Sequence, residues 1–313
     1  MKLKRQNLPQ LPAHIARPAY ALNDVTAGIA HIGVGGFHRA HQAAYTDALD
    51  EHWRRARLGH MRHRTRAPTN RPCATPSPRR ITYYTLVELD DRPDTEVRVM
   101  GSIREMLLVA EDGSEAVVAR LADPAIRIVS LTITEGGYCM DDSTGEFNAK
   151  LPHIQHDVEN PRTPISVFGL LCAALAKRRG QGLPAFTVMS CDNLPHNGDV
   201  TRKATLAFAS LVDVELASWI ERYVSFPNAM VDRITPMTSL AHRKDLKQQH
   251  GIDDAWPVVC EPFVQWVLED KFVSGRPAWE NVGVQFTDDV TPYEEMKIKL
   301  LNGSHLALTY LGL

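Results

Sequence analysis

Clustered cysteines and long apolar runs are both missing from this sequence. Its 313 residues contain five cysteines, which lie far apart without the spacing of metal ligands (Cys73, Cys139, Cys172, Cys191 and Cys260). We therefore expect reduced thiols rather than a disulfide framework. No apolar run approaches the ~18 residues of a membrane-spanning helix, and the basic N-terminus is not followed by the apolar region of a signal peptide. These absences favour a soluble, cytoplasmic protein with no membrane partner.

Residues 52–80 lack acidic side chains and lysine altogether. The whole chain has 35 basic and 37 acidic residues and a formal net charge of −2, but this stretch contains nine arginines and four prolines. Elsewhere 26 basic residues face the 37 acidic ones. An arginine-rich patch could bind nucleic acid, yet Trp53 is its single aromatic residue, and base stacking needs several. We therefore expect no nucleic-acid partner, and we interpret the stretch as foreign to an otherwise acidic protein.

Metal-ligand motifs are absent as well. His153, His156 and His196 do not form an HxxxH pattern, and no CxxC pair accompanies them. The sequence therefore predicts no metal site, and it argues against zinc-dependent oxidation of alcohols.

Short apolar runs that alternate with helical patterns are what the sequence does contain. The runs predict strands at residues 29–34, 126–133 and 186–190, and apolar residues at helical spacing predict helices at residues 38–49, 164–179, 200–211 and 293–311. Strands alternating with helices are typical of an α/β fold with a doubly wound, mainly parallel sheet. We therefore predict a Rossmann-like architecture.

A glycine-rich loop follows the first predicted strand and opens the first predicted helix. In this context glycines let the backbone approach a pyrophosphate, so we expect dinucleotide contacts from Gly33, Gly35, Gly36, Phe37 and His38. The motif is incomplete because a histidine stands where a third glycine is usual, and an ordinary strand–helix turn remains possible. Arg39 either binds phosphate or substrate, or supports the helix.

Five stretches of the sequence carry a resemblance to a known family. They are residues 32–41 (IGVGGFHRAH), 132–138 (TITEGGY), 190–198 (SCDNLPHNG), 226–236 (FPNAMVDRITP) and 297–305 (KIKLLNGSH). Together they resemble the polyol-specific long-chain dehydrogenases, the mannitol dehydrogenase family, over residues 20–313 with one gap. The stretches around residues 190–236 and 293–305 are most similar to the mannitol 2-dehydrogenase branch of that family.

The resemblance implies a division into domains. Members of the family have a Rossmann-like nucleotide-binding domain followed by a mostly helical domain that contributes to the substrate site. We therefore expect a dinucleotide-binding domain at residues 1–287 and the first helix of a helical substrate domain at residues 288–313. Because the chain stops within that helix on an apolar run, we expect it to be cut short.

The resemblance also implies an activity. Family members interconvert a polyol and a ketose, such as D-mannitol and D-fructose, by metal-independent hydride transfer with NAD(P). Fructuronate and tagaturonate reductases and arabinitol dehydrogenases belong to the same family, so these activities stay open. An inactive fragment that only binds nucleotide stays open too. We expect NAD as the cofactor, with NADP not excluded, and a monomer when the protein is full length.

Three residues of the expected catalytic centre come from this match. The resemblance implies that Lys297 is the base that takes the hydroxyl proton, and that Asn193 and Asn302 donate hydrogen bonds to the alkoxide. In an α-helix Lys297 and Asn302 would point about 140° apart. They converge only if the lysine side chain curls round or the helix is irregular.

Three further residues complete the expected site. The resemblance implies that His305 binds a substrate hydroxyl, and that Glu294 passes a proton between Lys297 and solvent. Asp232 either supports the lysine or caps a turn.

The foreign stretch at residues 52–80 falls where the family has its second strand and the acid that contacts the adenosine ribose. Arginine without lysine, together with proline, threonine and histidine, is typical of a GC-rich frame translated out of register. We therefore hypothesise a compensated frameshift or a sequencing error, and the choice between NAD and NADP is not readable from this chain.

Overall fold

The protein is described here by a computed structural model that covers residues 2–20, 26–59, 83–89 and 96–303, without the side chains of residues 5, 52–59, 301 and 302. It divides into two compact units, each made of several chain segments. The first comprises Met1–Thr26, Gly35–Met106 and Arg233–Val264, and the second comprises Ala27–Val34, Leu107–Asp232 and Gln265–Leu313. The predicted division between residues 287 and 288 is a different one, and it stays a prediction.

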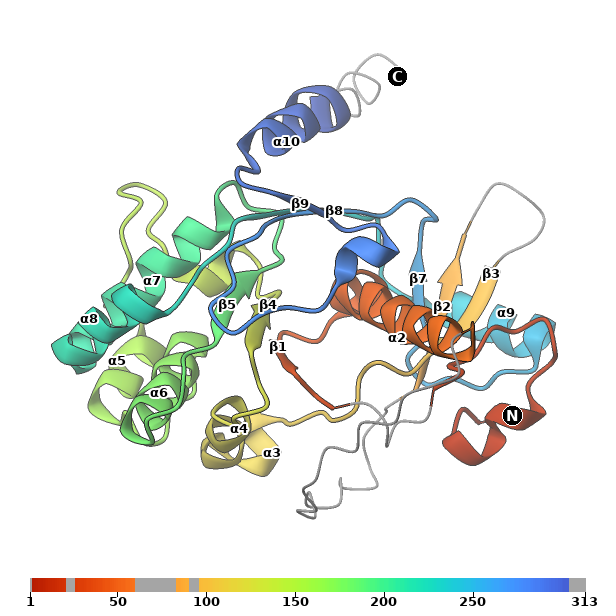
Figure 1. The fold of residues 1–313 in the computed structure, drawn as a ribbon, viewed down its shortest axis with the longest axis horizontal. Coiled ribbons are helices and arrows are strands. Elements are labelled where there is room, and N and C mark those ends of the chain that lie inside the picture. The colour runs from red at the N-terminus through yellow and green to blue at the C-terminus, as the bar shows by residue number, and fades with distance from the viewer. Residues whose placement is uncertain (1, 21–25, 60–82, 90–95, 304–313) are drawn as a thin grey trace. The chain divides into compact units, whose positions relative to one another are not determined.

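A parallel three-stranded sheet in the order β1-β4-β5 forms the centre of the second unit. Its strands are β1 (Ile29–Ile32), β4 (Ile128–Leu131) and β5 (Thr187–Ser190). Every residue of β4 and β5 is buried, as is usual for strands of a covered parallel sheet. The register pairs Ile32 with Leu131 and Leu131 with Ser190, so the three carboxyl ends meet at one edge (Figure 1). The α/β fold predicted from the sequence is confirmed.

Helices of the second unit share one apolar core with this sheet, to which the first of them contributes only the partly buried Val109. They are α3 (Val109–Asp112), α4 (Ser114–Leu121), α5 (Pro152–Glu159), α6 (Val167–Gly180), α7 (Asn197–Val212) and α8 (Val214–Tyr223), with the short η3 (Glu135–Tyr138) after β4. Phe168 of α6, Phe186 before β5 and Phe208 of α7 belong to one apolar core. Burying such side chains is worth about 1.5–3 kcal/mol each. The core thus fixes the loops that leave the sheet.

A second sheet of the same unit has the order β6-β8-β9. Its strands are β6 (Ala229–Asp232), β8 (Gln265–Glu269) and β9 (Gln285–Thr287), and the short η4 (Trp279–Val282) lies between the last two. After β9 the chain forms α10 (Thr291–Met296) and then a π-helical segment, η5 (Lys297–Asn302). The helix predicted from residue 293 is thus present with the irregularity that was left open as an alternative, and residues 304–311 lie outside the described part.

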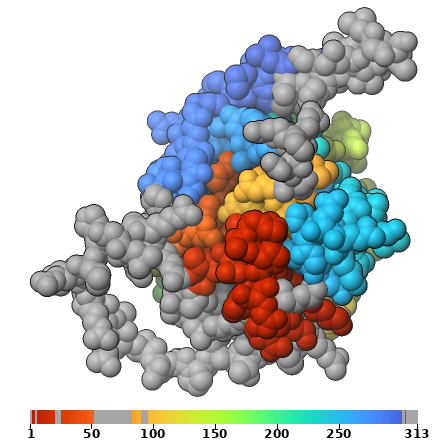
Figure 2. Space-filling model, turned by 90° about the vertical axis from the view of Figure 1, so that its right-hand side faces the viewer, coloured from red at the N-terminus to blue at the C-terminus, as the bar shows by residue number. Residues whose placement is uncertain are grey.

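The first unit has a mixed sheet of its own, in the order β3-β2-β7. It consists of β2 (Tyr84–Glu88), β3 (Glu96–Met100) and β7 (Val258–Cys260), with the helices η1 (Arg5–Gln10), α1 (Gly36–Ala40), α2 (Gln42–Gly59) and α9 (Leu240–His250). Figure 2 shows the N-terminal segment in red beside α9 in cyan, and a bridge between Lys2 and Asp253 joins these parts of the chain.

The first predicted helix, at residues 38–49, differs from the observed one in its bounds and in its continuity. The helix begins earlier, at Gly36, and it is interrupted at His41, whose backbone angles are φ −111° and ψ −93°. The ring of His41 stacks on Phe37, with ring centres 4.9 Å apart. The second part continues to Gly59, because residues 50–58 contain neither proline nor glycine.

No helix among the described residues combines the length and the apolarity that crossing a membrane requires.

Candidate functional site

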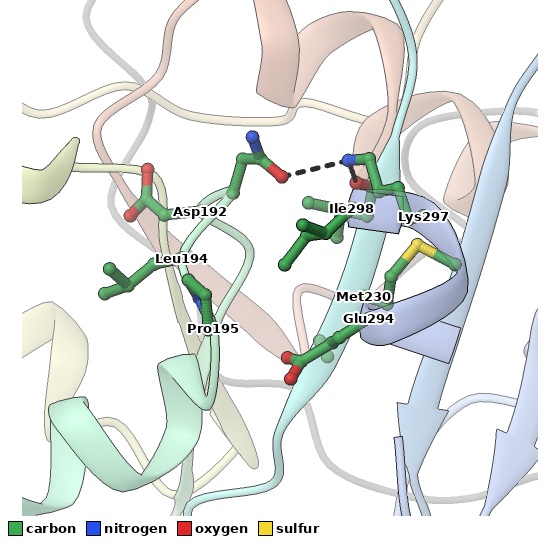
Figure 3. Close-up of a pocket in the computed structure, with 10 residues that line it drawn as sticks. Asp192, Leu194, Pro195, Met230, Glu294, Lys297 and Ile298 are labelled. Carbon is green, nitrogen blue, oxygen red and sulfur yellow. Dashed lines mark hydrogen bonds between the residues drawn. The ribbon is translucent and has the colours of Figure 1, made fainter. Parts of the chain in front are cut away.

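Lys297 lies at the centre of the candidate site and is bonded to three groups of the second unit. Its Nζ donates hydrogen bonds to Asn193 Oδ1 at 2.9 Å and to the carbonyl of Val231 at 2.6 Å. Asp232 Oδ1 lies 3.3 Å from the same nitrogen. The lysine is only 9% exposed, so its ammonium group depends on these acceptors (Figure 3).

Three separate elements bring these groups together. Asn193 lies in the loop that leaves β5 at the carboxyl edge of the parallel sheet, where ligands of α/β proteins usually bind. Val231 and Asp232 end β6 of the other sheet, and Lys297 begins the π-helical segment. Of the residues predicted from the sequence, Asn193, Asp232 and Lys297 are therefore in direct contact. This contact favours the supporting role of Asp232 over a turn cap.

A cavity of about 200 Å³ adjoins the lysine. Its polar side chains come from Asp192, Asn193, Glu294 and Lys297, and its apolar lining includes Leu194, Met230 and Ile298. A few convergent polar groups on apolar walls are typical of small-molecule sites.

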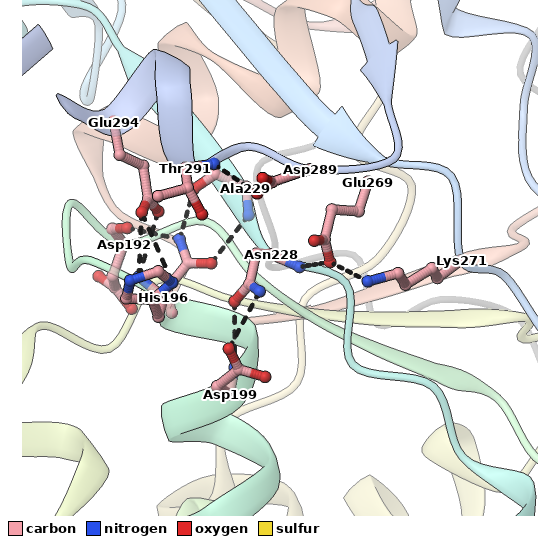
Figure 4. Close-up of polar contacts among 11 residues, drawn as sticks. Asp192, His196, Asp199, Asn228, Ala229, Glu269, Lys271, Asp289, Thr291 and Glu294 are labelled. Carbon is pink, nitrogen blue, oxygen red and sulfur yellow. Dashed lines mark hydrogen bonds and ion pairs between the residues drawn. The ribbon is translucent and has the colours of Figure 1, made fainter. Parts of the chain in front are cut away.

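Glu294 is the buried carboxyl group of this cavity. It is 7% exposed, and burial raises its pKa above the ordinary value. The backbone N–H of His196 donates to Glu294 Oε1 at 3.1 Å, and the imidazole Nδ1 lies 3.9 Å from Oε2 (Figure 4). His196 is the N-cap residue of α7, and its backbone has a positive φ of 50°. Because it lines the cavity beside Lys297, Glu294 is placed to exchange protons there.

The π-helical segment changes the expected relation of Lys297 to Asn302. In a π-helix the hydrogen bonds run from residue i to residue i+5, so position 302 follows position 297 after about one turn. Because the helix is irregular here, the angle of about 140° expected between positions 297 and 302 of an α-helix does not apply. The side chain of Asn302 and the whole of His305 lie outside the described residues, and their roles stay predictions.

Gly33 gives the strand–loop junction after β1 a conformation that other residues do not fit. Its φ is 95°, and a Cβ atom at this position would lie 1.9 Å from the carbonyl oxygen of Thr132. The Thr132 hydroxyl donates to the carbonyl of Gly33 at 2.7 Å. The loop and the end of β4 therefore meet with backbone against backbone, which only glycine allows at this position.

The rest of the predicted nucleotide loop belongs to the first unit. Gly35 is the N-cap of α1, which Gly36 and Phe37 begin. His38 is buried and 6% exposed. Neither the dinucleotide contacts nor the alternative of an ordinary turn is decided by this placement.

Arg39 is buried beneath the same loop. Its guanidinium lies 3.6 Å from the ring centre of Trp256, and Nε donates to the carbonyl of Gly35 at 3.1 Å. Burial lowers the pKa of Arg39 to about 10. With 3% exposure, Arg39 is placed to support the loop rather than to reach a substrate.

Asp192 is a residue of the site that the sequence did not single out. Its carboxylate accepts hydrogen bonds from the backbone N–H groups of Ile133 and Thr134, at 2.9 and 3.0 Å, and from the Tyr138 hydroxyl at 2.7 Å. Thr134 is held at φ 62° and ψ 165°, a region that non-glycine residues rarely occupy. Burial raises the pKa of Tyr138. The position of Asp192 directly before Asn193 in the quoted motif was the available signal.

Within the described parts of the chain, no group of three or more His, Cys, Asp or Glu is placed to hold a metal.

Comparison with known proteins gives a consistent family. The family model described as mannitol dehydrogenase Rossmann domain matches residues 27–281. The polyol:NADP oxidoreductase of Gluconobacter oxydans (strain 621H) is 46% identical over 99% of this chain and 64% of its own length. The mannitol 2-dehydrogenase of Cereibacter sphaeroides is 48% identical over 95% of this chain and 61% of its own length.

Solved structures of polyol dehydrogenases are also similar to this chain. The ternary complex of Pseudomonas fluorescens mannitol 2-dehydrogenase with NAD and D-mannitol is 63% identical, with a TM-score of 0.85 over 100% of this chain and 63% of that chain. Substrate-free D-sorbitol dehydrogenase is 43% identical, with a TM-score of 0.86, and 63% of it is covered. The chain thus spans less than two thirds of the length of these relatives. From the model match to residues 27–281, the chain belongs to the mannitol dehydrogenase family and contains its Rossmann domain.

Proposed function

We propose that the protein is an NAD-dependent oxidoreductase that interconverts a polyol and a ketose, with D-mannitol and D-fructose as the first candidates. One observation carries the proposal: Lys297 is buried at a cavity with its Nζ between Asn193 Oδ1 and the carbonyl of Val231. The relative solved with NAD and D-mannitol supports this choice of ligands.

The geometry supports a division of roles between the lysine and the asparagine. NAD, when bound, accepts the hydride of the alcohol carbon. Lys297 takes the hydroxyl proton in its unprotonated form, because the two N–H bonds of the neutral amine can donate to Asn193 and Val231 and leave the lone pair for the substrate, and proton uptake then gives the ammonium. The amide oxygen of Asn193 already accepts from Lys297, so the Nδ2 group is left to donate to the developing alkoxide. Asp232 balances the ammonium charge beside the reaction centre.

Glu294 is the proposed proton carrier between this centre and the surroundings. It lines the same cavity as Lys297 and contacts His196, whose side chain is 52% exposed. A carboxyl group whose pKa is raised by burial gives up and takes a proton closer to neutral pH than an exposed one.

The residues present fit a nucleotide at the loop after β1. The Thr132 carbonyl already fills the place of a side chain at Gly33, so the glycine lets strand and loop pack closely, and it is the family's glycine motif at this loop that supports a nucleotide here. We propose NAD rather than NADP, although a polyol:NADP oxidoreductase is among the relatives. The selectivity region falls within residues 52–80, of which residues 60–80 and the side chains of residues 52–59 lie outside the described part.

We further propose that the protein acts in the cytoplasm and is a monomer when full length. The four cysteines of the described residues are buried and unpaired, which supports a reducing compartment. The oligomeric state can be measured by sedimentation of a fusion that adds the C-terminal third of a mannitol 2-dehydrogenase relative.

The test is a turnover assay of this chain beside a fusion that adds the C-terminal third of a mannitol 2-dehydrogenase relative. Mannitol, fructose and fructuronate are supplied with NAD(H) and with NADP(H). We expect the fusion to reduce fructose with NADH. Preferential reduction of fructuronate would assign the reductase branch of the family instead. Nucleotide binding without turnover of any substrate would contradict the enzymatic proposal and favour a binding fragment.

A further inference from the structure

Asn197 is a buried amide that joins the two segments on which Lys297 depends. It begins α7 and is 0% exposed. Its Nδ2 donates to the carbonyl of Asp192 at 3.0 Å and to the carbonyl of Ala229 at 2.7 Å, and its Oδ1 accepts from the N–H of Ala229 at 2.9 Å. Both amide hydrogens and the oxygen are thus engaged. Its two partners, Asp192 in the loop after β5 and Ala229 in β6, are labelled in Figure 4.

These two segments hold the acceptors of the lysine. Asp192 immediately precedes Asn193, whose Oδ1 accepts from Lys297, and Ala229 lies two residues before Val231, whose carbonyl is the other acceptor. The Asn193 loop leaves the parallel sheet, whereas Val231 lies in the sheet of β6, and within the described strands no ladder joins β5 to β6. The amide of Asn197 supplies a link that the sheets do not.

The packing at the start of α7 leaves little freedom for this link. A Cβ atom at Gly198 would lie 2.5 Å from the carbonyl oxygen of Pro227, so the helix touches the backbone of the segment before β6. The Thr201 hydroxyl donates to the carbonyl of Asn197 at 2.6 Å and fixes the first turn. The start of α7, the Asn193 loop and β6 are therefore joined at Asn197.

We propose that Asn197 is a positioning residue that keeps the Asn193 amide and the Val231 carbonyl at bonding distance from Lys297. Asn197 neither lines the cavity nor touches the lysine, so it acts through the two acceptors. A relative shift of about 1 Å between the segments would lengthen one of the two bonds beyond hydrogen-bonding range. This inference rests on the proposed function for its catalytic meaning, but the geometry can be tested without turnover.

The test measures how fast Lys297 reacts with a small amine-acylating reagent, read by mass spectrometry of its peptide. Lys299 serves as the internal reference, because it is exposed and its Nζ contacts only Glu295 among the described residues. In Asn197→Ala we expect the ratio of Lys297 to Lys299 labelling to rise about tenfold, the factor expected for one lost hydrogen bond to a charged group. Asn197→Asp is the second variant, since it retains an acceptor for the Ala229 N–H.

Asn228→Ala is the matched control. It removes amide hydrogen bonds with Asp199, at 3.1 and 3.2 Å, from the same region but none to the Asn193 loop. We expect the control to label like the wild type. Wild-type labelling ratios in folded Asn197→Ala and Asn197→Asp would overturn the proposal, as would an equal rise in the control.

The turnover measurement separates this proposal from the proposed function. In the fusion protein, Asn197→Ala should lower kcat with NADH binding unchanged, whereas a merely structural role would lower the folded fraction and leave kcat per folded molecule intact. If the wild type turns over nothing, the proposed function fails, and the labelling ratio still decides the role of Asn197.

Discussion

Glu294 shows how a single buried carboxyl group gives the site a pH dependence. Burial raises its pKa from 4.5, and the charges of Glu269 and Asp199 act in the same direction, while contacts with His196 oppose them. Between the ordinary pKa and the raised one, the folded protein binds more protons at this group than the unfolded chain does. Stability therefore falls as pH rises through this window.

Replacing Glu294 with glutamine should remove this loss of stability. Glu294→Gln keeps an oxygen that accepts from the N–H of His196, but it no longer ionises. We expect its free energy of unfolding, relative to the wild type, to increase from pH 4.5 to pH 7, measured by urea denaturation. Glu295→Gln is the control: Lys299 lowers the pKa of Glu295, so its contribution is lost only as pH falls below about 4.5, and this variant should show no comparable change between pH 4.5 and pH 7. A difference for Glu294→Gln that does not change with pH would show that the group is not buried in this way.

At this scale the sequence could predict side chains but not backbone partners. Lys297, Asn193 and Asp232 could be singled out because they lie in the motifs that carry the family resemblance, and Lys297 contacts the other two. The carbonyl of Val231 cannot be recognised from a sequence motif, because every residue has a backbone carbonyl. Its oxygen nevertheless lies 2.6 Å from the lysine Nζ. The buried amide of Asn197 was equally hidden, because asparagine before glycine also reads as an ordinary turn.

Elements were predictable where a regular apolar pattern sets them. The strands at β4 and β5 were found within two residues, because their buried β-branched runs are distinctive. The interruption at His41 has no signal in the sequence, and the irregular helix from Lys297 is only one of two alternatives that the sequence leaves open. Both are departures from the periodicity on which such predictions rest, and only packing decides them.

Gly33 offers a test of the junction between β1 and the nucleotide loop. Gly33→Ala should destabilise the fold by two effects, the positive φ of 95° and the approach of Cβ to within 1.9 Å of the Thr132 oxygen. Gly113→Ala is the matched control, because its φ is 81° but nothing lies within 4 Å of the Cβ position. We expect the control to lose about 1–2 kcal/mol and Gly33→Ala to lose more, by chemical denaturation. Equal losses of stability in the two variants would mean that the close approach to Thr132 adds nothing to the effect of the positive φ.

For the whole molecule, the notable contrast is between a largely acidic sequence and one arginine-rich stretch. Each unit has an apolar core of its own, and the candidate lysine site lies entirely within the second. The sequence of residues 52–80 belongs to neither pattern, because it lacks the acid that a nucleotide-binding unit places near the adenosine ribose. We therefore expect this stretch to weaken cofactor binding, and we attribute that expected weakening to the missing acid.

Exchanging that stretch tests the attribution directly. Residues 52–80 are replaced by the corresponding stretch of the Cereibacter sphaeroides relative, and NADH affinity is measured by fluorescence titration. The family resemblance implies an acidic partner for the ribose hydroxyls in the inserted stretch, and a hydrogen bond to a charged group is worth about 1.5–3 kcal/mol, so we expect affinity to rise at least about tenfold. A control exchange that inserts the same stretch with its acids changed to amides should recover only part of the gain. If the original chain binds NADH as tightly as the exchanged one, residues 52–80 do not limit cofactor binding, and an uninterrupted reading frame in resequenced DNA would then be expected.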